Sequence, residues 1–354
     1  MTISAKERTL LDDCAYLPAL PRAYGDLCGS GTIRCVPGDF HVTEFSGIEP
    51  AGEGEHLWIR VRKTGQNTRW VARALAEYLD LPYKAVSFAG MKDRHAVTEQ
   101  WLSAHMPGKP DPDLSAHGID GVEVLASSRH NHKLRPGQLS YNRFRIVLRN
   151  CRAINLADLE RRASRIAENG IPNYFGTQRF GRDRANLGLA RDIEEFRSLG
   201  REARGFFLSA FRGALFNGYL AERVRDECWD TMLEGEAELS DRPRGAAESD
   251  RTVFRTRRQP SGLLWGRGRN SAVGDAHERD MRFFAGFPGA TALLEAAGSR
   301  LSRRVLRAQV ADFSVAQHDD SIELEFALGP GVFATIVLRE LFDFDDRTQG
   351  KNPE

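Results

Sequence analysis

Alternation of apolar and polar positions dominates the first part of the chain, and it predicts a series of short strands. Residues 56–62 alternate apolar side chains with Trp58, Arg60 and Arg62, the pattern of a strand that has one wet face. Similar short runs follow, separated by Gly- and Pro-containing turns. The predicted strands are two within 29–45 around the turn 37–39, then 56–62, 85–88, 97–103, one at Val122 and Val124, and one at Phe144, Ile146 and Leu148.

Helical spacing replaces alternation in several later segments. Residues 68–79 form an amphipathic pattern that Asn67 or Thr68 can cap, and residues 156–168 form another that Gly170 would end. Helical patterns then dominate at 190–199, 205–225 and 290–297, around a polar stretch at 234–250 that we expect to be an exposed excursion. The chain returns to a strand at 321–328, a short helix at 333–341 and a polar tail, 345–354, that we expect to be frayed. This order suggests a second domain inserted into the first.

Charge is balanced overall but unevenly distributed. The 354 residues contain 50 Lys and Arg against 49 Asp and Glu. Two runs nevertheless lack acids: residues 129–149 carry six Lys or Arg, and residues 300–307 carry four Arg. Such runs are typical of a solvated face, yet two of them in a neutral protein also hint at a localised phosphate-binding surface.

Cysteine and histidine spacing gives no sign of a metal centre. The five cysteines are scattered and include no Cys-x-x-Cys pair, so neither a disulfide framework nor a zinc site is indicated. His130 and His132 form a pair that lacks a third ligand nearby, and no metal is predicted. Apolar stretches are too short to span a bilayer, and residues 1–10 lack the apolar core of a signal peptide. We therefore expect a cytoplasmic protein without a membrane partner.

The densest motif is FAGMKDRHAVTEQW, residues 88–101, in which a strand meets a glycine turn, several charged residues and another strand. Loops on rigid strand ends often carry catalytic side chains. Asp93 lies between Lys92 and Arg94, whose charges could keep its carboxylate ionised and oriented. A solvated turn between two strands is the alternative interpretation of the pattern alone.

This motif closely resembles the signature of the TruD family of pseudouridine synthases, which modify uridine 13 of tRNA. Seven further segments resemble the family in the same order, and together they cover roughly residues 25–342. They are DFHVTE, GEGEHLWIRVRKTGQNTRWVA, RHNHKLRPGQL, NRF, PNYFGTQRFG, SAFRGALFN and FATIVLREL.

The resemblance implies an α+β fold, in which a catalytic domain with a mixed, mainly antiparallel sheet is split by an inserted α/β TRUD domain. We place the first part of the catalytic domain at 1–167, the insertion at 168–308, and the completing part with the tail at 309–354.

The resemblance also implies roles for individual residues. Asp93 matches the catalytic carboxylate, assigned as the nucleophile, and Arg34 stands where the family often has a Lys that pairs with it. Phe144 matches the aromatic residue that stacks on the target base, and Phe40, Asn142 and Phe333 match positions that line the uridine pocket. The basic loop at residues 129–135 is implied to contact RNA phosphates through Arg129, Lys133 and Arg135. For PNYFGTQRFG, RNA contact and a structural turn with core aromatics stay equally open.

The implied reaction breaks the N1–C1′ bond, turns the base over and joins C5 to C1′. Nothing is oxidised or added, so no cofactor is expected. A carboxylate can attack the sugar or the base, or remove a sugar proton, and the sequence leaves these routes open. The expected partner is the tRNA substrate, with no obligate protein partner. The rival hypotheses are a non-catalytic RNA-binding protein and, more distantly, a hydrolase that uses Asp93.

Overall fold

One mixed sheet of ten strands organises the fold in the computed structural model, which describes residues 2–237, 239–240, 253–254 and 258–348. Its pairs are antiparallel except for β2 with β5 and β1 with β16, which are parallel. This confirms the predicted α+β class with a mainly antiparallel sheet. The central path follows the order β14 (Val310–His318), β15 (Ser321–Leu328), β7 (Tyr141–Arg152), β2 (Phe40–Phe45), β5 (Val97–His105), β3 (His56–Thr64) and β6 (Val122–His130), with β1 (Ser30–Ile33) pairing β7 and β16 (Asp343–Asp346), and β4 (Val86–Phe88) pairing β5.

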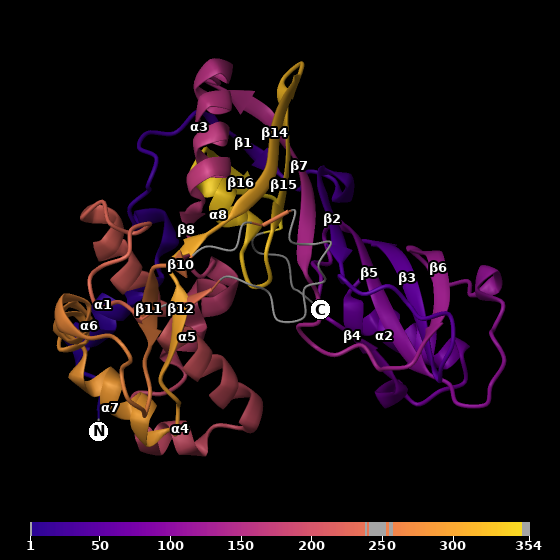
Figure 1. The fold of residues 1–354 in the computed structure, drawn as a ribbon, viewed down its shortest axis with the longest axis horizontal. Coiled ribbons are helices and arrows are strands. Elements are labelled where there is room, and N and C mark those ends of the chain that lie inside the picture. Colours follow the sequence, from indigo (N-terminus) through magenta and orange to yellow (C-terminus); the bar gives the residue numbers. More distant parts are fainter. Residues whose placement is uncertain (1, 238, 241–252, 255–257, 349–354) are drawn as a thin grey trace.

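Helix α2 (Thr68–Tyr78) covers one face of the β3–β5 region, as the change of period predicts. The Asn67 side chain caps the helix by accepting a hydrogen bond from the Arg69 N–H. Its buried side chains, among them Val71 and Leu75, join the inward residues of β3 in one apolar cluster. Figure 1 shows α2 beside β4 and β5, at the end of the molecule formed by the edge strands.

The opposite face of β3 differs from the prediction. Trp58 was expected on a wet face, yet it is fully buried. The segment after β6 folds back over this face, so that the Trp58 indole N–H donates to the His132 carbonyl at 2.9 Å and the ring packs with Leu134 and Leu139. The prediction was wrong because alternation within one strand does not report what a distant loop covers.

A helical lobe forms the other side of the molecule (Figure 1). Its longest element, α5 (Arg201–Arg225), has several fully buried aromatic side chains, including Phe207, Phe211 and Phe216. The helices of this lobe are α1 (Ala5–Ala15), α4 (Ile193–Ser198), α5 (Arg201–Arg225), α6 (Gly274–Phe284) and α7 (Pro288–Ala296). Short strand pairs accompany them: β11 (Ser261–Leu264) with β12 (Ser302–Val305), β10 (Arg258–Gln259) with β9 (Leu239–Ser240), and β13 (Arg307–Ala308) with β8 (Ile171–Pro172).

Helices α3 (Leu156–Asn169) and α8 (Ala334–Arg339) join the lobe to the sheet. Helix α3 contacts β14 and ends at Gly170, as predicted. Gly170 has a φ of 76°, and a Cβ there would lie 2.3 Å from the Ala308 carbonyl oxygen, so glycine fits for both reasons. The short 3-10 helices are Leu17–Ala19, Pro37–Asp39, Tyr83–Ala85, Leu114–Ala116, Thr177–Phe180 and Arg182–Gly188.

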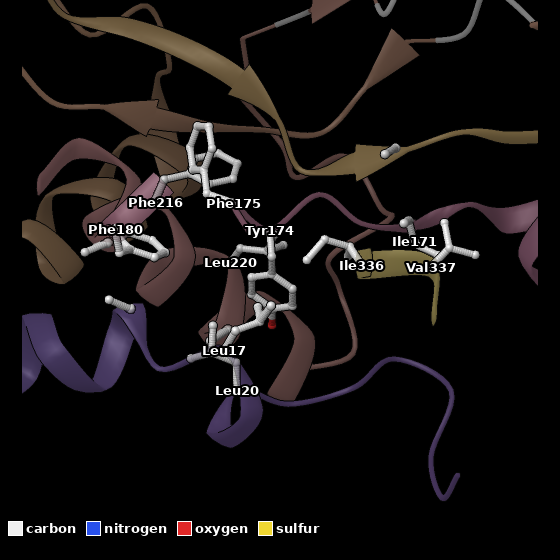
Figure 2. Packing of buried hydrophobic residues seen from close by; sticks show 14 of the residues in the cluster. Leu17, Leu20, Ile171, Tyr174, Phe175, Phe180, Phe216, Leu220, Ile336 and Val337 are labelled. Atoms are coloured by element: carbon white, nitrogen blue, oxygen red, sulfur yellow. The ribbon is translucent and has the colours of Figure 1, made fainter. Parts of the chain in front are cut away.

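The largest apolar core lies where distant segments meet. Figure 2 shows Tyr174 among side chains from the N-terminal segment (Leu17, Leu20), from α5 (Leu220) and from α8 (Ile336). Tyr174 is fully buried, and its hydroxyl donates to the Pro21 carbonyl at 3.2 Å. PNYFGTQRFG therefore supplies core aromatics: Tyr174, Phe175 and Phe180 are all buried.

Strands β14 and β15 rejoin the sheet of β7 after the helical lobe, as an insertion would require. The N-terminal helix α1, however, packs against α5 rather than on the sheet. Its Glu7 carboxylate accepts hydrogen bonds from the Gly289 and Ala290 N–H groups at the start of α7. The division at 168 and 308 stays a prediction.

Two predictions for polar segments were wrong in part. The tail was expected to be frayed from residue 345, yet residues 343–346 form β16 beside β1, while 349–354 lie outside the described residues. Within the predicted excursion at 234–250, Glu236 is buried and accepts a hydrogen bond from the Leu233 N–H; residues 238 and 241–250 lie outside the described part. Helices α1 and α6 and strand β14 were not predicted.

No helix in the described part of the chain combines the length and apolar character needed to cross a bilayer.

Candidate active site

The loop between β4 and β5 presents Asp93, and side chains from three other elements hold its backbone. The Thr68 hydroxyl, at the start of α2, accepts from the Lys92 N–H at 3.0 Å and donates to Gln100 Oε1 at 3.0 Å. Gln100 Nε2 in turn donates to the Gly90 carbonyl at 3.1 Å. These bonds fix the backbone of the loop just ahead of Asp93, which is the pre-organisation that a catalytic side chain needs.

Lys63 on β3 holds the Asp93 peptide itself. Its fully buried ammonium donates to the Asp93 carbonyl at 2.7 Å and to the Gln66 carbonyl at 2.8 Å. Burial lowers the pKa of Lys63 to about 8; the nearby Asp93 charge opposes this shift and Lys92 adds to it. Sequence reasoning assigned Lys63 no role, because a lysine in an alternating strand normally reaches solvent.

The lowered pKa of Lys63 predicts a measurable pH dependence. The folded state releases this proton near pH 8, whereas an unfolded lysine keeps it to about pH 10.4. The cost of burying the charge is therefore fully present at pH 7 and is relieved as the pH rises. We expect the free energy of unfolding of the wild type to rise relative to Lys63→Met between pH 7 and 10. Denaturant titrations of both proteins measure the difference, and a flat difference would contradict this assignment.

Asp93 pairs with Arg34, as predicted from the resemblance. Arg34 Nη2 lies 2.8 Å from Asp93 Oδ2, with 41% of the Asp93 side chain exposed and only 3% of the Arg34 side chain. Arg34 follows β1 with a φ of 56° and lies over the Phe40 ring at 3.9 Å from its centroid. Its Nη1 donates to Asp346 on β16, a residue that the sequence analysis missed. The buried cation thus holds an accessible carboxylate.

Lys92 and Arg94 do not perform the task predicted for them. Lys92 turns away from Asp93, and its Nζ lies 2.6 Å from Glu44 Oε2 and 2.6 Å from Asn142 Oδ1. Arg94 is exposed and donates to the Gly65 carbonyl at 3.3 Å. The cation beside Asp93 is instead Arg34, the residue after β1, because successive side chains in the Asp93 loop point to different sides.

Register brings the other predicted pocket residues together. Asn142 and Phe144 lie two residues apart on β7, so they share a face. Asn142 pairs with Glu44 of the neighbouring strand β2. The Phe144 ring meets the Phe40 ring edge-on at a centroid distance of 6.2 Å. Burial raises the pKa of the Glu44 carboxyl, and the Lys92 ammonium opposes that shift.

Phe144 is a core residue as well as a candidate for stacking. Only 8% of it is exposed, and Phe326 stacks against it at 5.6 Å. Phe333 lies just beyond the end of β15, whose Leu328 pairs with Asn142. A Cβ on Gly176 would lie 3.5 Å from Phe333 Cγ, so the PNYFGTQRFG segment packs closely on this ring.

The predicted basic surface is smaller than the sequence suggests. Arg129 is tied to Asp111 at 2.6 Å and to the Met106 and Lys109 carbonyls. In the second acid-free run, Arg303 pairs with Asp280 at 2.7 Å, and Arg304 lies over the Phe175 ring. The suggested phosphate surface at 300–307 was therefore wrong for these two arginines. Their partners, Asp280 and Phe175, lie outside the run, so the absence of acids within it did not show that the arginines face solvent.

Lys133 and Arg135 remain exposed, in a loop that adjoins the Asp93 loop. The Gly137 N–H donates to the Ala89 carbonyl at 2.7 Å, immediately before the GMKDR turn. Lys133 also lines a shallow hollow of about 430 Å³ with Lys84, His56 and His105.

His130 packs edge-on against Trp58, at a ring-centroid distance of 4.6 Å. Within the described ranges, no group of three His, Cys, Asp or Glu could hold a metal ion.

Comparison with known proteins agrees with this geometry. The chain resembles the crystal structure of a protein from Methanosarcina mazei described as tRNA pseudouridine synthase D (TruD), with a TM-score of 0.72 and 21% identity, covering 96% of this chain and 98% of that one. The two chains therefore share one fold over nearly their whole length.

Sequence comparison is more specific. A family model described as tRNA pseudouridine synthase D (TruD) matches residues 26–193 and 189–341. A protein named tRNA pseudouridine synthase D from Methylococcus capsulatus (strain Bath) is 40% identical over 343 residues, covering 94% of this chain and 97% of the relative. One of the same name from Pseudomonas aeruginosa (strain LESB58) is 40% identical over 344 residues, covering 94% and 96%. The chain belongs to the TruD family.

Proposed function

We propose that this chain isomerises uridine to pseudouridine at position 13 of tRNA, with Asp93 as the catalytic carboxylate. Membership of the family carries the conversion of uridine in tRNA to pseudouridine. The observation that carries the assignment of Asp93 is its accessible carboxylate on a loop whose backbone is fixed, beside the buried guanidinium of Arg34.

The described residues suit each step of this isomerisation. Asp93 supplies the carboxylate while the N1–C1′ bond breaks and the C5–C1′ bond forms; N1 gains a proton and C5 loses one. Lys92 occupies the Asn142 carbonyl oxygen, which leaves the Asn142 amide N–H groups for a uracil oxygen. Phe144 and Phe40 would form the apolar floor under the detached base, with Phe333 beside it. Phe326 already stacks against the Phe144 ring, so the base would meet the part of the ring that is still exposed.

Release of tritium from tRNA labelled at C5 of uridine tests the proposed reaction, since replacement of C5–H by C5–C1′ liberates it without any added co-substrate. Mapping the modified nucleotide then tests position 13. A non-catalytic RNA-binding protein would bind tRNA without releasing tritium, and a hydrolase would yield free uracil. Either outcome would replace the proposal.

We propose that the loop carrying Lys133 and Arg135 binds the phosphate backbone of the RNA. Arg129 would hold the start of this loop in place through its contacts with Asp111 and with the Met106 and Lys109 carbonyls. Neutralising both as Lys133→Gln/Arg135→Gln should weaken tRNA binding and flatten the log–log salt dependence by roughly 0.7 to 0.9 per lost phosphate contact. Phe144→Leu should leave that slope unchanged and lower turnover, because stacking does not release counterions. Leucine is used because replacing a buried phenylalanine by alanine lowers the free energy of unfolding by about 3–5 kcal/mol.

Parallel salt titrations of the two variants decide whether this loop is the binding surface. An unchanged slope in the Lys133/Arg135 variant, or the same loss of slope in Phe144→Leu, would show that phosphates are bound elsewhere.

We propose that no metal or redox cofactor takes part, because the reaction is an isomerisation without net electron transfer. Turnover should survive dialysis against EDTA, provided that the tRNA is folded beforehand. Loss of turnover that a divalent ion restores at constant tRNA structure would contradict this. We place the action of this chain in the cytoplasm, which fractionation of cells tests. We propose no obligate protein partner, which a pull-down from the same cells tests.

A further inference from the structure

The Arg34 guanidinium bridges two carboxylates, only one of which belongs to the proposed chemistry. Nη2 faces Asp93, and Nη1 faces Asp346 Oδ2. Asp346 is 8% exposed at its side chain, against 41% for Asp93. The residues matched by the family model end at 341, so Asp346 lies beyond them.

Asp346 is itself held in place. Strand β16 runs parallel to β1, with Asp346 opposite Ile33, the residue before Arg34. The Arg347 N–H donates to the Ile33 carbonyl at 3.3 Å and continues this pairing. Asp346 Oδ1 accepts from the Thr348 N–H at 3.0 Å and from the Thr348 hydroxyl at 2.7 Å. One carboxylate oxygen is therefore anchored to its own turn and the other is left for Arg34.

Arg34 needs such an anchor because its backbone is unusual. A φ of 56° puts this non-glycine residue in the left-handed region, which persists only where surrounding contacts hold it. The Phe40 ring supports one face of the guanidinium at 3.9 Å. A flat support leaves in-plane rotation free, and a carboxylate that binds Nη1 removes that freedom.

We propose that Asp346 is a positioning residue for the catalytic site: it fixes the Arg34 guanidinium so that Nη2 alone faces Asp93. This rests on the proposed role of Asp93. In the structure Nη1 meets Asp346 while Nη2 meets Asp93 through Oδ2, so the guanidinium holds Asp93 by one oxygen. Asp93 Oδ1 then accepts no hydrogen bond from the described residues and stays available to the substrate. Arginine suits this bridge because its planar fork reaches two acceptors at once.

The test compares Asp346→Asn with Asp345→Asn, a matched control on the same strand whose side chain is exposed. We expect Asp346→Asn to lower kcat by on the order of 10- to 100-fold while KM for tRNA changes less than about 3-fold. The two constants should separate in this way because Asp346 reaches Asp93 through Arg34. Asp345→Asn should match the wild type in both measurements.

A merely structural role would lower the melting temperature while kcat, corrected for the folded fraction, stays equal to that of the control, and that result would overturn the proposal. So would a loss confined to KM for tRNA. If Asp346→Asn does not fold, Thr348→Val is the second variant: it removes one hydrogen bond from Asp346 Oδ1 and should lower kcat by about 2- to 5-fold. Wild-type kcat in Thr348→Val would then overturn the proposal.

Asp93→Asn is assayed alongside, and it keeps the two proposals apart. If Asp93→Asn turns over normally, the proposed role of Asp93 fails, and the positioning role that rests on it fails with it. If Asp93→Asn is inactive while Asp346→Asn equals its control, only the positioning role fails.

Discussion

Asp93→Asn should abolish pseudouridine formation and leave tRNA binding within a few-fold of the wild type. Asparagine keeps the size of the side chain and an oxygen that can accept from Arg34, but it cannot act as a nucleophile or a base. We expect turnover to fall by at least about 10³-fold, which corresponds to about 4 kcal/mol of transition-state stabilisation. Single-turnover tritium release and a tRNA binding titration measure the two effects separately.

The structure predicts that this substitution is tolerated by the fold. Asp93 is 41% exposed, and Arg34 keeps its second carboxylate partner, Asp346. The melting temperature should therefore stay close to that of Asp345→Asn, the exposed control. Substantial turnover by Asp93→Asn would refute the assignment, and a parallel loss of tRNA binding would place Asp93 in binding rather than in chemistry.

Sequence alone could locate the Asp93–Arg34 pair because the family resemblance covers both positions, Asp93 within its motif and Arg34 just ahead of DFHVTE. It could not give the side-chain directions around them. Lys92 and Arg94 adjoin Asp93 in the chain, yet the structure uses Arg34 as its cation, since the loop turns Lys92 toward Glu44. Direction in a loop depends on what holds its backbone, and here the holders are Thr68, Gln100 and Lys63, from three separate elements.

Asp346 was beyond prediction for a different reason. The segment DFDD, residues 343–346, is as polar as a frayed tail and has little of the alternation that indicates a half-buried strand. It becomes a strand because β1 offers it an edge, and the two are separated by about 300 residues in the chain. The apolar strands, β3, β5, β7 and β15, were predictable because their apolar residues report burial locally, whatever covers their second face.

The buried arginines of 300–307 show the same limit from the other side. Absence of acids within the run suggested a phosphate surface, but Asp280 and Phe175 reach Arg303 and Arg304 from elsewhere in the chain. A charge run therefore predicts a surface only when no partner from another element is available. The loop of Lys133 and Arg135 meets that condition, as both side chains are exposed.

Lys92→Met should destabilise the protein by about 3–5 kcal/mol at pH 8, because it leaves Glu44 buried without its cation. The Glu44 side chain is fully buried, and burial already raises the pKa of its carboxyl. A carboxyl whose pKa is raised in the folded protein takes up a proton at a higher pH there than in the unfolded chain, and the protonated form is the cheaper one to bury. The free energy of unfolding of Lys92→Met should therefore increase as the pH falls from 8 toward 5. Denaturant unfolding at the two pH values measures this.

A second substitution separates the stability role of Lys92 from its role in the site. Lys92→Met/Glu44→Gln removes the unpaired charge, so it should regain most of the lost stability and lose the pH dependence. Turnover should stay low, because Asn142 Oδ1 no longer has the Lys92 ammonium at 2.6 Å to set which way its amide points. Wild-type turnover in the double variant would show that Lys92 only neutralises Glu44, whereas low turnover with restored stability assigns it the orientation of Asn142.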